Sequence, residues 1–421
     1  MSKIFVQIAS YRDAELLKTL RDLRSKSSGQ NHITIGLCWQ KDHTESIGEF
    51  SNDSDVRVLS VDWQHSKGLG WARSEIQKMY NGEDYTLQLD SHHRFAKDWD
   101  SQLIAMYNSV LDTSSKPLLT SYAAGYDPDN DQLHGDAPCC ILPHDFKKSG
   151  TIWFNPTMIP EYMMLSRPIR ARFVSGHYFF TSGKHCEEYK YDPELYFAGD
   201  EIALSVRSYT MGYDLYHPHI NVVWHYYGRH DKCKHWGDHN EKNKQDGQVE
   251  KTWMERDVFS KQKIRQLLGQ DNYNINLGEY GLGNIRSLHD YELYSGIDFK
   301  NKRISKSAIN GAEPPVDYVS ETERLLDFKK IIPINIIHWN RNKFLELIND
   351  IHNLKLVLFN LRQDMIYETN IDAEFIKSNT ILSTMVESDY VPMRYQLIAY
   401  NKNNHIIYQI HNDLRHGIHW N

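Results

Sequence analysis

In the N-terminal two thirds of the chain, short apolar runs typical of strands alternate with segments in which apolar residues recur at helical spacing. Short runs rich in β-branched and aromatic residues predict strands, and between them apolar residues recur at helical spacing. The run Lys3–Ser10, for example, is followed by Leu16, Leu17, Leu20 and Leu23. The predicted strands are 3–10, 32–40, 56–63, 85–89, 117–122, 173–181 and 221–227, and the predicted helices are 13–26, 72–80, 99–111, 199–211 and 253–268. This alternation predicts an α/β fold.

Strands that alternate with helices predict a Rossmann-like, mostly parallel sheet with helices on both faces. In such sheets ligands bind outside the carboxyl ends of the strands. Two polar segments fall at such ends, Ser10-Tyr11-Arg12-Asp13 after the first strand and Asp90-Ser91-His92 after the strand at 85–89. Asp13 also stands where the first helix would be capped. Both segments are therefore expected at one site.

The pattern changes twice further along the chain. From about Asp127 to Pro168 it is irregular and rich in Pro, Gly and aromatic residues, which predicts a surface loop at the active site. Beyond Ser305, residues 306–315 read as a linker, and residues 316–421 are rich in Ile, Asn and Tyr. Runs at 395–400 and 405–410 flank a polar Asn-Lys-Asn-Asn segment, which predicts a β-hairpin. We therefore predict a large α/β domain over 1–305 and a small β-rich accessory domain over 316–421.

Composition narrows the class of protein. Among 421 residues, 40% are hydrophobic and 12% aromatic, which argues against disorder. No window holds the roughly 18 unbroken apolar residues of a membrane span. The start MSKIFVQIASYRDAE reads as a strand rather than a secretory signal. The five cysteines are odd in number and lack CxxC spacing, which favours reduced thiols. We therefore expect a cytoplasmic protein.

The charge balance is mildly acidic. Lysine and arginine number 48 and aspartate and glutamate 55, so the formal net charge is −7. Without a long basic run, the chain lacks the electrostatic signature of a dedicated nucleic-acid binder. A divalent cation or a polar substrate is compatible with this balance. The protein could also form a homo-oligomer.

The segment LQLDSHHRF carries the most specific candidate chemistry. Asp90 and His92 are separated by one residue at the end of an extended strand, so their side chains can point the same way and bind one cation. A carboxylate with an imidazole suits manganese or another divalent metal. His225, near the end of a later strand, is a third candidate ligand, and the alternative is a packed histidine. By the same alternation His93 points away and is interpreted as structural.

An acidic pair and several cations are further candidates. Asp200 and Glu201 begin a predicted helix, where they either stabilise its first turn or orient and deprotonate an acceptor hydroxyl. Arg12, Lys67 and Arg73 could bind phosphate or be ordinary exposed charges.

Two other patterns carry less weight. Residues 278–283 (GEYGLG) are glycine-rich but lack the lysine of a phosphate loop. His230, Cys233, His235 and His239 are zinc-like residue types, but the hydrophilic stretch 228–248 favours a mobile lid instead.

Several segments in consistent order resemble a known family. They are IFVQIASYRDAELLKTLRDL, GLCWQ, GLGWARSEIQKMYNGEDYTLQLDSHHRFAKDWD, GDEIALSVRSYTMGYDLYHP, NVVWHYY and YGLGNIRSLHDYELYSGIDF. Over roughly residues 3–300 the chain resembles the family-60 glycosyltransferases. These are GlcNAc-transferases whose eukaryotic members modify hydroxyproline in a cytoplasmic ubiquitin-ligase adaptor. The resemblance implies a GT-A fold for the 1–305 domain, with a Rossmann-like mixed sheet flanked by helices. It also implies a UDP-GlcNAc donor, a divalent metal usually taken as Mn²⁺, and transfer with retention of anomeric configuration.

The resemblance also implies roles for individual residues. Asp90-Ser91-His92 stands where the family has an Asp-x-His version of its Asp-x-Asp motif, and His225 looks like the later metal-binding histidine. Asp200-Glu201 matches an acidic pair that is more often Glu-Glu in relatives, and either acid could be the key one. The expected donor-binding residues are Ser10, Tyr11, Arg12, Asp13, Lys67, Trp71, Arg73, Asp90 and Ser91.

Together these features predict a metal-dependent retaining glycosyltransferase. The sugar, expected to be GlcNAc, would move from a UDP-sugar to a hydroxyl of a protein (hydroxyproline-like) or a glycan. Retention could arise by front-face attack, with the departing phosphate accepting the proton, or through a covalent intermediate on Asp200 or Glu201. The alternatives are a non-catalytic glycan- or protein-binding module on the same fold and a sugar-nucleotide hydrolase. The segment after Ser305 has no counterpart in the family and is expected to bind the acceptor or mediate association.

Overall fold

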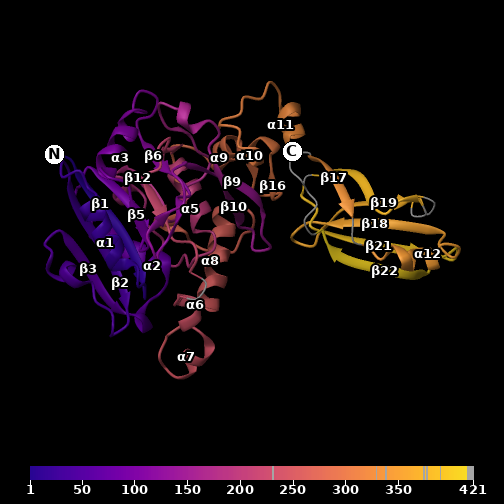
Figure 1. Cartoon of the computed structure of the whole chain (residues 1–421), viewed down its shortest axis with the longest axis horizontal. Helices are drawn as coiled ribbons and strands as arrows, with labels where there is room; N and C mark the ends of the chain where they lie inside the picture. The colour runs from indigo at the N-terminus through magenta and orange to yellow at the C-terminus, as the bar shows by residue number, and fades with distance from the viewer. Residues whose placement is uncertain are drawn as a thin grey trace. The chain divides into compact units, whose positions relative to one another are not determined.

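A computed structural model describes residues 1–229, 232–328, 330–336, 339–372, 375, 378–388 and 390–414 (Figure 1). The chain forms two compact units. The first comprises Met1–Leu142, Phe154–Ser295 and Gly311–Pro315, and the second comprises Pro143–Trp153, Gly296–Asn310 and Val316–Asn421. The boundaries predicted at 305 and 316 stay a prediction.

The first unit is built on an eight-stranded mixed sheet with the order β11-β13-β6-β12-β4-β1-β2-β3. Its strands are β1 (Lys3–Tyr11), β2 (His32–Lys41), β3 (Val56–Asp62), β4 (Tyr85–Asp90), β6 (Pro117–Thr120), β11 (Ile169–Arg170), β12 (Tyr178–Ser182) and β13 (Asp214–His217). β1 pairs in parallel with β2 and β4, whereas β12 runs antiparallel to both β4 and β6. The sheet is therefore mixed, as expected.

Helices cover both faces of this sheet, as the alternating pattern predicted. Because successive side chains of a strand point to opposite faces, Ile4 and Val6 of β1 belong to one core cluster and Phe5 to another. The first cluster includes residues of α1 (Leu16–Ser25) and α3 (Trp99–Asn108), and the second includes residues of α2 (Leu69–Gln77). Figure 1 shows these helices alongside the sheet.

A smaller four-stranded sheet brings distant parts of the chain together. It has the order β5-β14-β7-β8, with β5 (His93–Phe95), β14 (Val223–His225), β7 (Ala124–Asp127) and β8 (Gln132–Leu133). β4 leads into β5 through Ser91 and His92, and β14 pairs antiparallel with β5 so that His225 lies opposite His93. The end of β14 is therefore held beside the end of β4.

Two local expectations were wrong. The segment 127–168 is not a plain loop, because it contains β9 (Cys139–Phe146) and β10 (Ile152–Met158). Buried and exposed residues alternate at the start of β10, and the density of Pro and Gly obscured this pattern. Asp13 does not cap α1, which begins at Leu16 after Glu15 and has no side-chain cap.

The second unit contains the β-rich region that the sequence predicted. β17 (Lys330–Ile336) pairs with β20 (Leu382–Ser388), and β19 (Met365–Ile371), β18 (Asn353–Phe359), β21 (Arg394–Tyr400) and β22 (Ile406–Asp413) form an antiparallel sheet in that order. The predicted hairpin is the β21–β22 pair. Its apolar core includes Leu356, Leu397 and Phe344 of α12 (Arg341–Glu346).

The remaining elements complete the chain. They are α4 (His185–Glu188), α5 (Asp200–Thr210), α6 (His235–Asp238), α7 (Glu241–Gln245), α8 (Trp253–Leu267), α9 (Leu288–Ser295), β15 (Ile297–Asp298), β16 (Arg303–Ile304), α10 (Lys306–Ile309), α11 (Glu321–Asp327) and the short 3₁₀ turns Gly48–Asn52, Trp63–His65, Tyr162–Met164 and Gly278–Tyr280. Among the described helices, none is both long and apolar enough to cross a bilayer.

Candidate functional site

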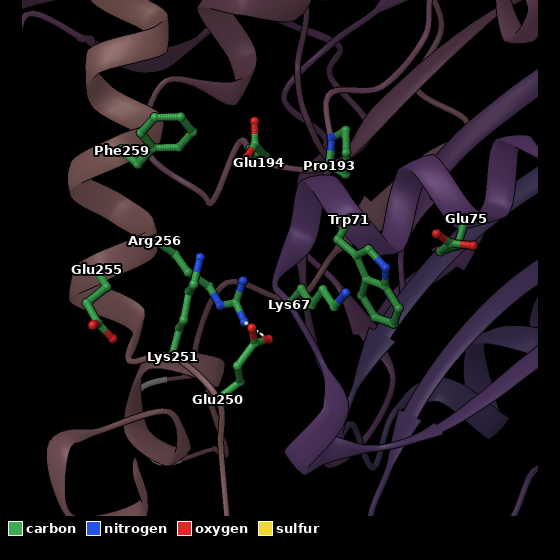
Figure 2. Close-up of a pocket in the computed structure, with 10 residues that line it drawn as sticks. All are labelled: Lys67, Trp71, Glu75, Pro193, Glu194, Glu250, Lys251, Glu255, Arg256 and Phe259. Atoms are coloured by element: carbon green, nitrogen blue, oxygen red, sulfur yellow. Dashed lines mark ion pairs between the residues drawn. The ribbon is translucent and has the colours of Figure 1, made fainter. Parts of the chain in front are cut away.

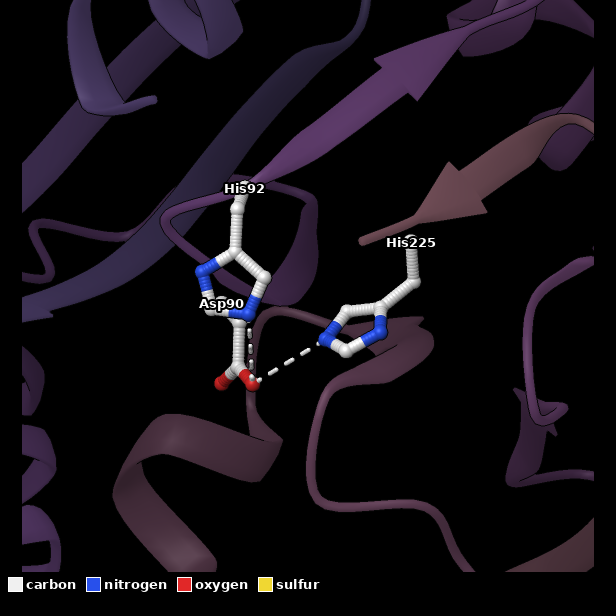
Figure 3. Close-up of side chains that lie close together, drawn as sticks. All are labelled: Asp90, His92 and His225. Carbon is white, nitrogen blue, oxygen red and sulfur yellow. Dashed lines mark ion pairs between the residues drawn. The ribbon is translucent and has the colours of Figure 1, made fainter. Parts of the chain in front are cut away.

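Asp90, His92 and His225 converge at the carboxyl end of β4 (Figure 3). Asp90 ends β4, His225 ends β14, and His92 lies in the turn between β4 and β5. Oδ2 of Asp90 lies 3.8 Å from Nε2 of His92 and 3.5 Å from Nε2 of His225. The candidate ligand atoms of the three residues lie within 4.8 Å of one another, and no other such group occurs among the described residues.

The chemistry of this group fits a divalent cation. Both ring nitrogens of His225 are buried and have no hydrogen-bond partner among the described residues. Burial lowers the pKa of His225 to about 3, so its ring is neutral and keeps a lone pair for a metal. Burial opposes ionisation of Asp90, but contact with His225, His92 and Arg73 holds the pKa of that carboxyl well below its ordinary value. An ionised carboxylate beside the neutral imidazole of His225, with the ring of His92 close by, is a donor set for a transition metal.

The ring of His92 is oriented from behind by Asp13. Nδ1 of His92 lies 2.7 Å from Oδ2 of Asp13, which also accepts a hydrogen bond of 2.6 Å from Oγ of Ser91. Burial disfavours the Asp13 carboxylate, yet these contacts and the charge of Arg229 lower its pKa to about 2. A carboxylate that binds one ring nitrogen leaves the other free for a metal. Asp13 and Ser91, which the sequence suggested as donor contacts, thus hold His92 in place.

Arg73 links Asp90, His92 and His225, the candidate metal-binding group, to the acidic pair. Its side chain is only 2% exposed, and its Nη2 lies 3.4 Å from Oδ1 of Asp90. Its Nη1 donates to Oδ2 of Asp200 and, at 2.8 Å, to the hydroxyl of Tyr191. Nη2 also donates to the carbonyl of Gly176. The charge of Asp200 is therefore balanced within the protein.

Among the residues that the structure describes, no cation forms an ion pair with Glu201, the second acid at the start of α5. Its Oε2 accepts a hydrogen bond of 2.6 Å from the hydroxyl of Tyr122, and its Oε1 accepts one of 3.0 Å from the amide of Gly176. Burial raises the pKa of Glu201. The two neighbouring acids thus have different environments, with Asp200 in an ion pair and Glu201 hydrogen-bonded only to neutral donors.

A cavity of about 270 Å³ lies against the metal-binding group. Its lining includes Asp90, Ser91, His92 and His225 and also Tyr11, all expected from the sequence. The residues that the sequence did not single out are Gln40, Tyr196, Phe197, Tyr226, Tyr227, Arg229 and Trp236, and His235 was noted only among the zinc-like residue types. For the aromatic residues, the only signal was the density of aromatic side chains in segments such as NVVWHYY and KHWG, and residue type alone does not assign them to a site.

The segment around α6 forms one wall of this cavity. The hydroxyl of Tyr196 lies 2.8 Å from Nδ1 of His235, and Asp238 accepts hydrogen bonds from Tyr11 at 2.9 Å and from Arg12 at 2.8 Å. Arg12 therefore has a carboxylate partner within the protein. His230, one of the four zinc-like residues, lies outside the described residues.

Three other predicted donor-binding residues lie elsewhere. Lys67 and Trp71 line a separate cavity of about 570 Å³ between α2 and α8. Ser10 is fully buried, and its backbone carbonyl accepts a hydrogen bond from Gln40. The structure therefore brings Tyr11 and the Asp90–His92 segment together with His225 but does not place Lys67 and Trp71 beside them.

The order of the strands defines the class of fold. Seven strands of the main sheet, numbered along the chain as β1, β2, β3, β4, β6, β12 and β13, lie in the order 3-2-1-4-6-5-7, with the sixth antiparallel. With an Asp-x-His segment after the fourth strand, this is the GT-A fold, and the predicted fold class is confirmed.

The family follows from the sequence. The model of the family described as glycosyltransferase (GlcNAc) matches residues 3–54 and 47–301. The chain belongs to this glycosyltransferase family, which confirms the resemblance noted above. No curated protein matches the chain.

Solved structures of two proteins, GalNAc-T7 and TarS, are similar to the chain. A structure of GalNAc-T7 with UDP, GalNAc and Mn²⁺ has a TM-score of 0.46 at 14% identity and covers 69% of this chain and 56% of its own. A structure of S. aureus TarS 1–349 in complex with UDP-GlcNAc has a TM-score of 0.32 at 12% identity and covers 51% of this chain and 58% of its own. The chain thus spans less than two thirds of either structure.

Proposed function

We propose that the protein is a metal-dependent, retaining glycosyltransferase that transfers GlcNAc from UDP-GlcNAc to an acceptor hydroxyl. The observation that carries the proposal is the Asp90, His92 and His225 group at the strand ends of a GT-A sheet, in a chain of the GlcNAc glycosyltransferase family. The adjoining cavity offers aromatic and polar contacts for a nucleotide, among them Tyr11 and Gln40.

The metal proposed for this group is Mn²⁺, held by Asp90, His92 and His225. When bound, such a cation neutralises the charge that accumulates on the departing diphosphate. Asp13 fixes the ring of His92, and Arg73 fixes the carboxylate of Asp90 and reduces its excess negative charge. The protein thus supplies a preorganised set of ligands, so that little rearrangement is needed when the donor binds.

Glu201 is the acid proposed to orient the acceptor hydroxyl. Burial raises the pKa of both acids, but Asp200 is held in an ion pair with Arg73, whereas Glu201 is hydrogen-bonded to neutral donors and can accept a hydrogen bond from the acceptor hydroxyl. Retention by front-face attack, with the departing phosphate accepting the proton, needs no enzyme nucleophile. The acceptor is a hydroxyl of a protein or glycan, and five free cysteines support a reducing, cytoplasmic compartment.

The test is release of UDP and transfer of sugar. UDP-GlcNAc and other UDP-sugars are incubated with the protein and Mn²⁺, and UDP and the anomeric configuration of the products are measured. We expect UDP-GlcNAc to be the preferred donor and a chelator to abolish the reaction, with activity restored by added Mn²⁺. Full activity after chelation would contradict metal dependence, and release of free sugar alone would indicate a hydrolase.

A matched pair of variants assigns the metal site. Asp90→Asn should lower activity by about a hundredfold or more, because it removes an ionised ligand. Asp62→Asn is the control, since Asp62 also ends a parallel strand, β3, but its side chain is 61% exposed and lies outside the metal-binding group. Equal effects of the two substitutions would argue against the assignment.

A further inference from the structure

The larger cavity of the first unit, about 570 Å³, takes no part in the site described above. It shares no lining residue with the metal-binding cavity. Figure 2 shows side chains that enter it from two sides, Trp71 from α2 and Lys67 from the segment before it, and Arg256 and Phe259 from α8 and Lys251 from the loop before it. Its volume is within the range of pockets that bind small ligands.

The wall between the two cavities is tightly packed. Lys67 lines the larger cavity, and the next residues, Gly68 and Leu69, line the metal-binding cavity. The amide of Gly70 donates a hydrogen bond of 3.1 Å to the carbonyl of Leu195. A Cβ added at Gly70 would lie 2.2 Å from that carbonyl oxygen, so no space remains between the two segments. The two cavities thus have different linings and are divided by packed backbone at Gly70.

The cations of the larger cavity are poorly neutralised. Among the described residues, the ammonium groups of Lys67 and Lys251 have no hydrogen-bond or ion-pair partner. Arg256 has one ion pair, at 3.8 Å, with Glu250, whose side chain is 71% exposed, and its buried Nε has no hydrogen-bond partner. Three basic side chains with unused donors in one cavity form a site for an oxyanion.

Three of the four acids of the same cavity are paired with cations that lie outside its lining, and the fourth, Glu250, is the partner of Arg256. Glu75 pairs with Lys78 at 2.7 Å, and Glu194 pairs at 2.9 Å with Lys263, which also pairs with Asp192. Glu255 pairs with Lys244 and also caps the start of α8. These pairings reduce the negative charge that faces the cavity, and a carboxylate has about four lone-pair positions, so it can still accept hydrogen bonds from hydroxyl groups.

Two aromatic side chains complete the lining, Trp71 on the α2 side and Phe259 on α8. Aromatic faces pack against the apolar face of a sugar ring, while carboxylates accept hydrogen bonds from its hydroxyls. A bare inorganic anion would use only the cations. We propose that this cavity binds an anionic carbohydrate, with a phosphate or carboxylate group contacting Lys67, Lys251 and Arg256 and a sugar ring lying against Trp71 or Phe259. In the transfer reaction this cavity would hold a charged part of the acceptor, a role that rests on the proposed function. Binding of the anionic carbohydrate to the cavity does not depend on that function.

The experiment measures binding of glucose 6-phosphate by calorimetry, without and with UDP and Mn²⁺. We expect equal affinity in both conditions, because the two cavities are separate. Glucose and inorganic phosphate should each bind at least about tenfold more weakly, since each lacks one half of the contacts. A comparison of glucuronate with glucose 6-phosphate tells whether the cavity prefers a carboxylate or a phosphate. Binding of either one more tightly than glucose and inorganic phosphate supports the site.

Charge-matched variants locate the site. The double variant Lys67→Gln and Lys251→Gln should weaken binding at least about tenfold. The control is Lys97→Gln with Lys184→Gln, which removes the same charge from two exposed lysines that line neither cavity. Trp71→Ala should weaken binding of glucose 6-phosphate but not that of phosphate.

Three results would overturn the proposal. They are competition of UDP with glucose 6-phosphate, equal loss in the control double variant, and phosphate binding as tightly as glucose 6-phosphate. None of these measurements depends on sugar transfer, so they can succeed or fail independently of the proposed activity.

Discussion

Arg73 is the residue on which most of the candidate site depends. Its buried guanidinium lies between Asp90 of the metal-binding group and Asp200 of α5 and also donates to Tyr191 and Gly176. Removing one partner of a buried ion pair leaves the others without compensation, which is more costly than losing a surface pair. Arg73 therefore has both a positioning and a structural role.

The variant Arg73→Met tests this role. We expect a loss of about 3 to 5 kcal/mol in the free energy of unfolding, measured by denaturant titration. The control is Arg21→Met, which breaks an exposed ion pair with Glu49 and should leave stability nearly unchanged. Similar stability of the two variants would contradict the bridging role.

Glu201 is the second residue with a defined test. In Glu201→Gln the amide keeps the size of the side chain but lacks the negative charge that orients the acceptor hydroxyl. We expect turnover to fall by about a hundredfold, with the affinity for UDP-GlcNAc unchanged in calorimetry. If the variant instead fails to bind UDP-GlcNAc, Glu201 binds the donor and does not orient the acceptor. Tyr122→Phe, which removes only the hydrogen bond to Glu201, should have a smaller effect.

At the scale of elements, the site depends on where α2 lies. Arg73 projects from α2, and α2 is held against the segment 192–195 by the close approach at Gly70. There is no room for a side chain at this position, because an added Cβ would also lie 2.6 Å from the carbonyl oxygen of Asp192. Glycine is required here by packing rather than by a left-handed backbone.

Gly70→Ala should therefore displace the start of α2. We expect a loss of about 2 kcal/mol or more in the free energy of unfolding, and a loss of activity through Arg73. Gly237→Ala in α6 is the control, since an added Cβ meets nothing within 4 Å there. A tolerated alanine at Gly70 would mean that the two segments separate easily, which would also weaken the case for two separate cavities.

At the scale of the whole molecule, the chain has apolar cores that share no residue. The main-sheet cluster contains residues from Ile4 to Val223, whereas the β-rich cluster contains residues from Ile334 to Ala399. Cores that are not continuous can unfold separately. The metal-binding group and its cavity lie entirely in the first unit.

Calorimetry of the full chain should accordingly give two heat-absorption transitions. UDP with Mn²⁺ should raise the temperature of one of them and leave the other unchanged, because a ligand stabilises only the unit that binds it. UDP after chelation is the control. A single transition that shifts as a whole would show that the two units unfold together.

Much of the fold could be predicted from the chain because its signals are local. The strands β1, β2, β3 and β4 and the helix α1 follow from periodicity, and their alternation implies the α/β class. The pairing of Asp90 with His92 follows from the alternation of side chains along an extended backbone. The β9 and β10 strands were missed because Pro and Gly residues obscured a weak alternating pattern.

The sequence determined the α/β class, the β-rich region, the family and the residue types at the end of β4, since each depends on neighbouring residues or on ordered motifs. Only the tertiary structure decided which distant groups meet. Pairing of β14 with β5 brings His225 to Asp90, and burial makes its ring neutral. Packing of α2 brings Arg73 into an ion pair with Asp200, whereas Lys67 and Trp71 line another cavity. Contacts between residues far apart in the chain are set by packing of whole elements, which no local pattern specifies.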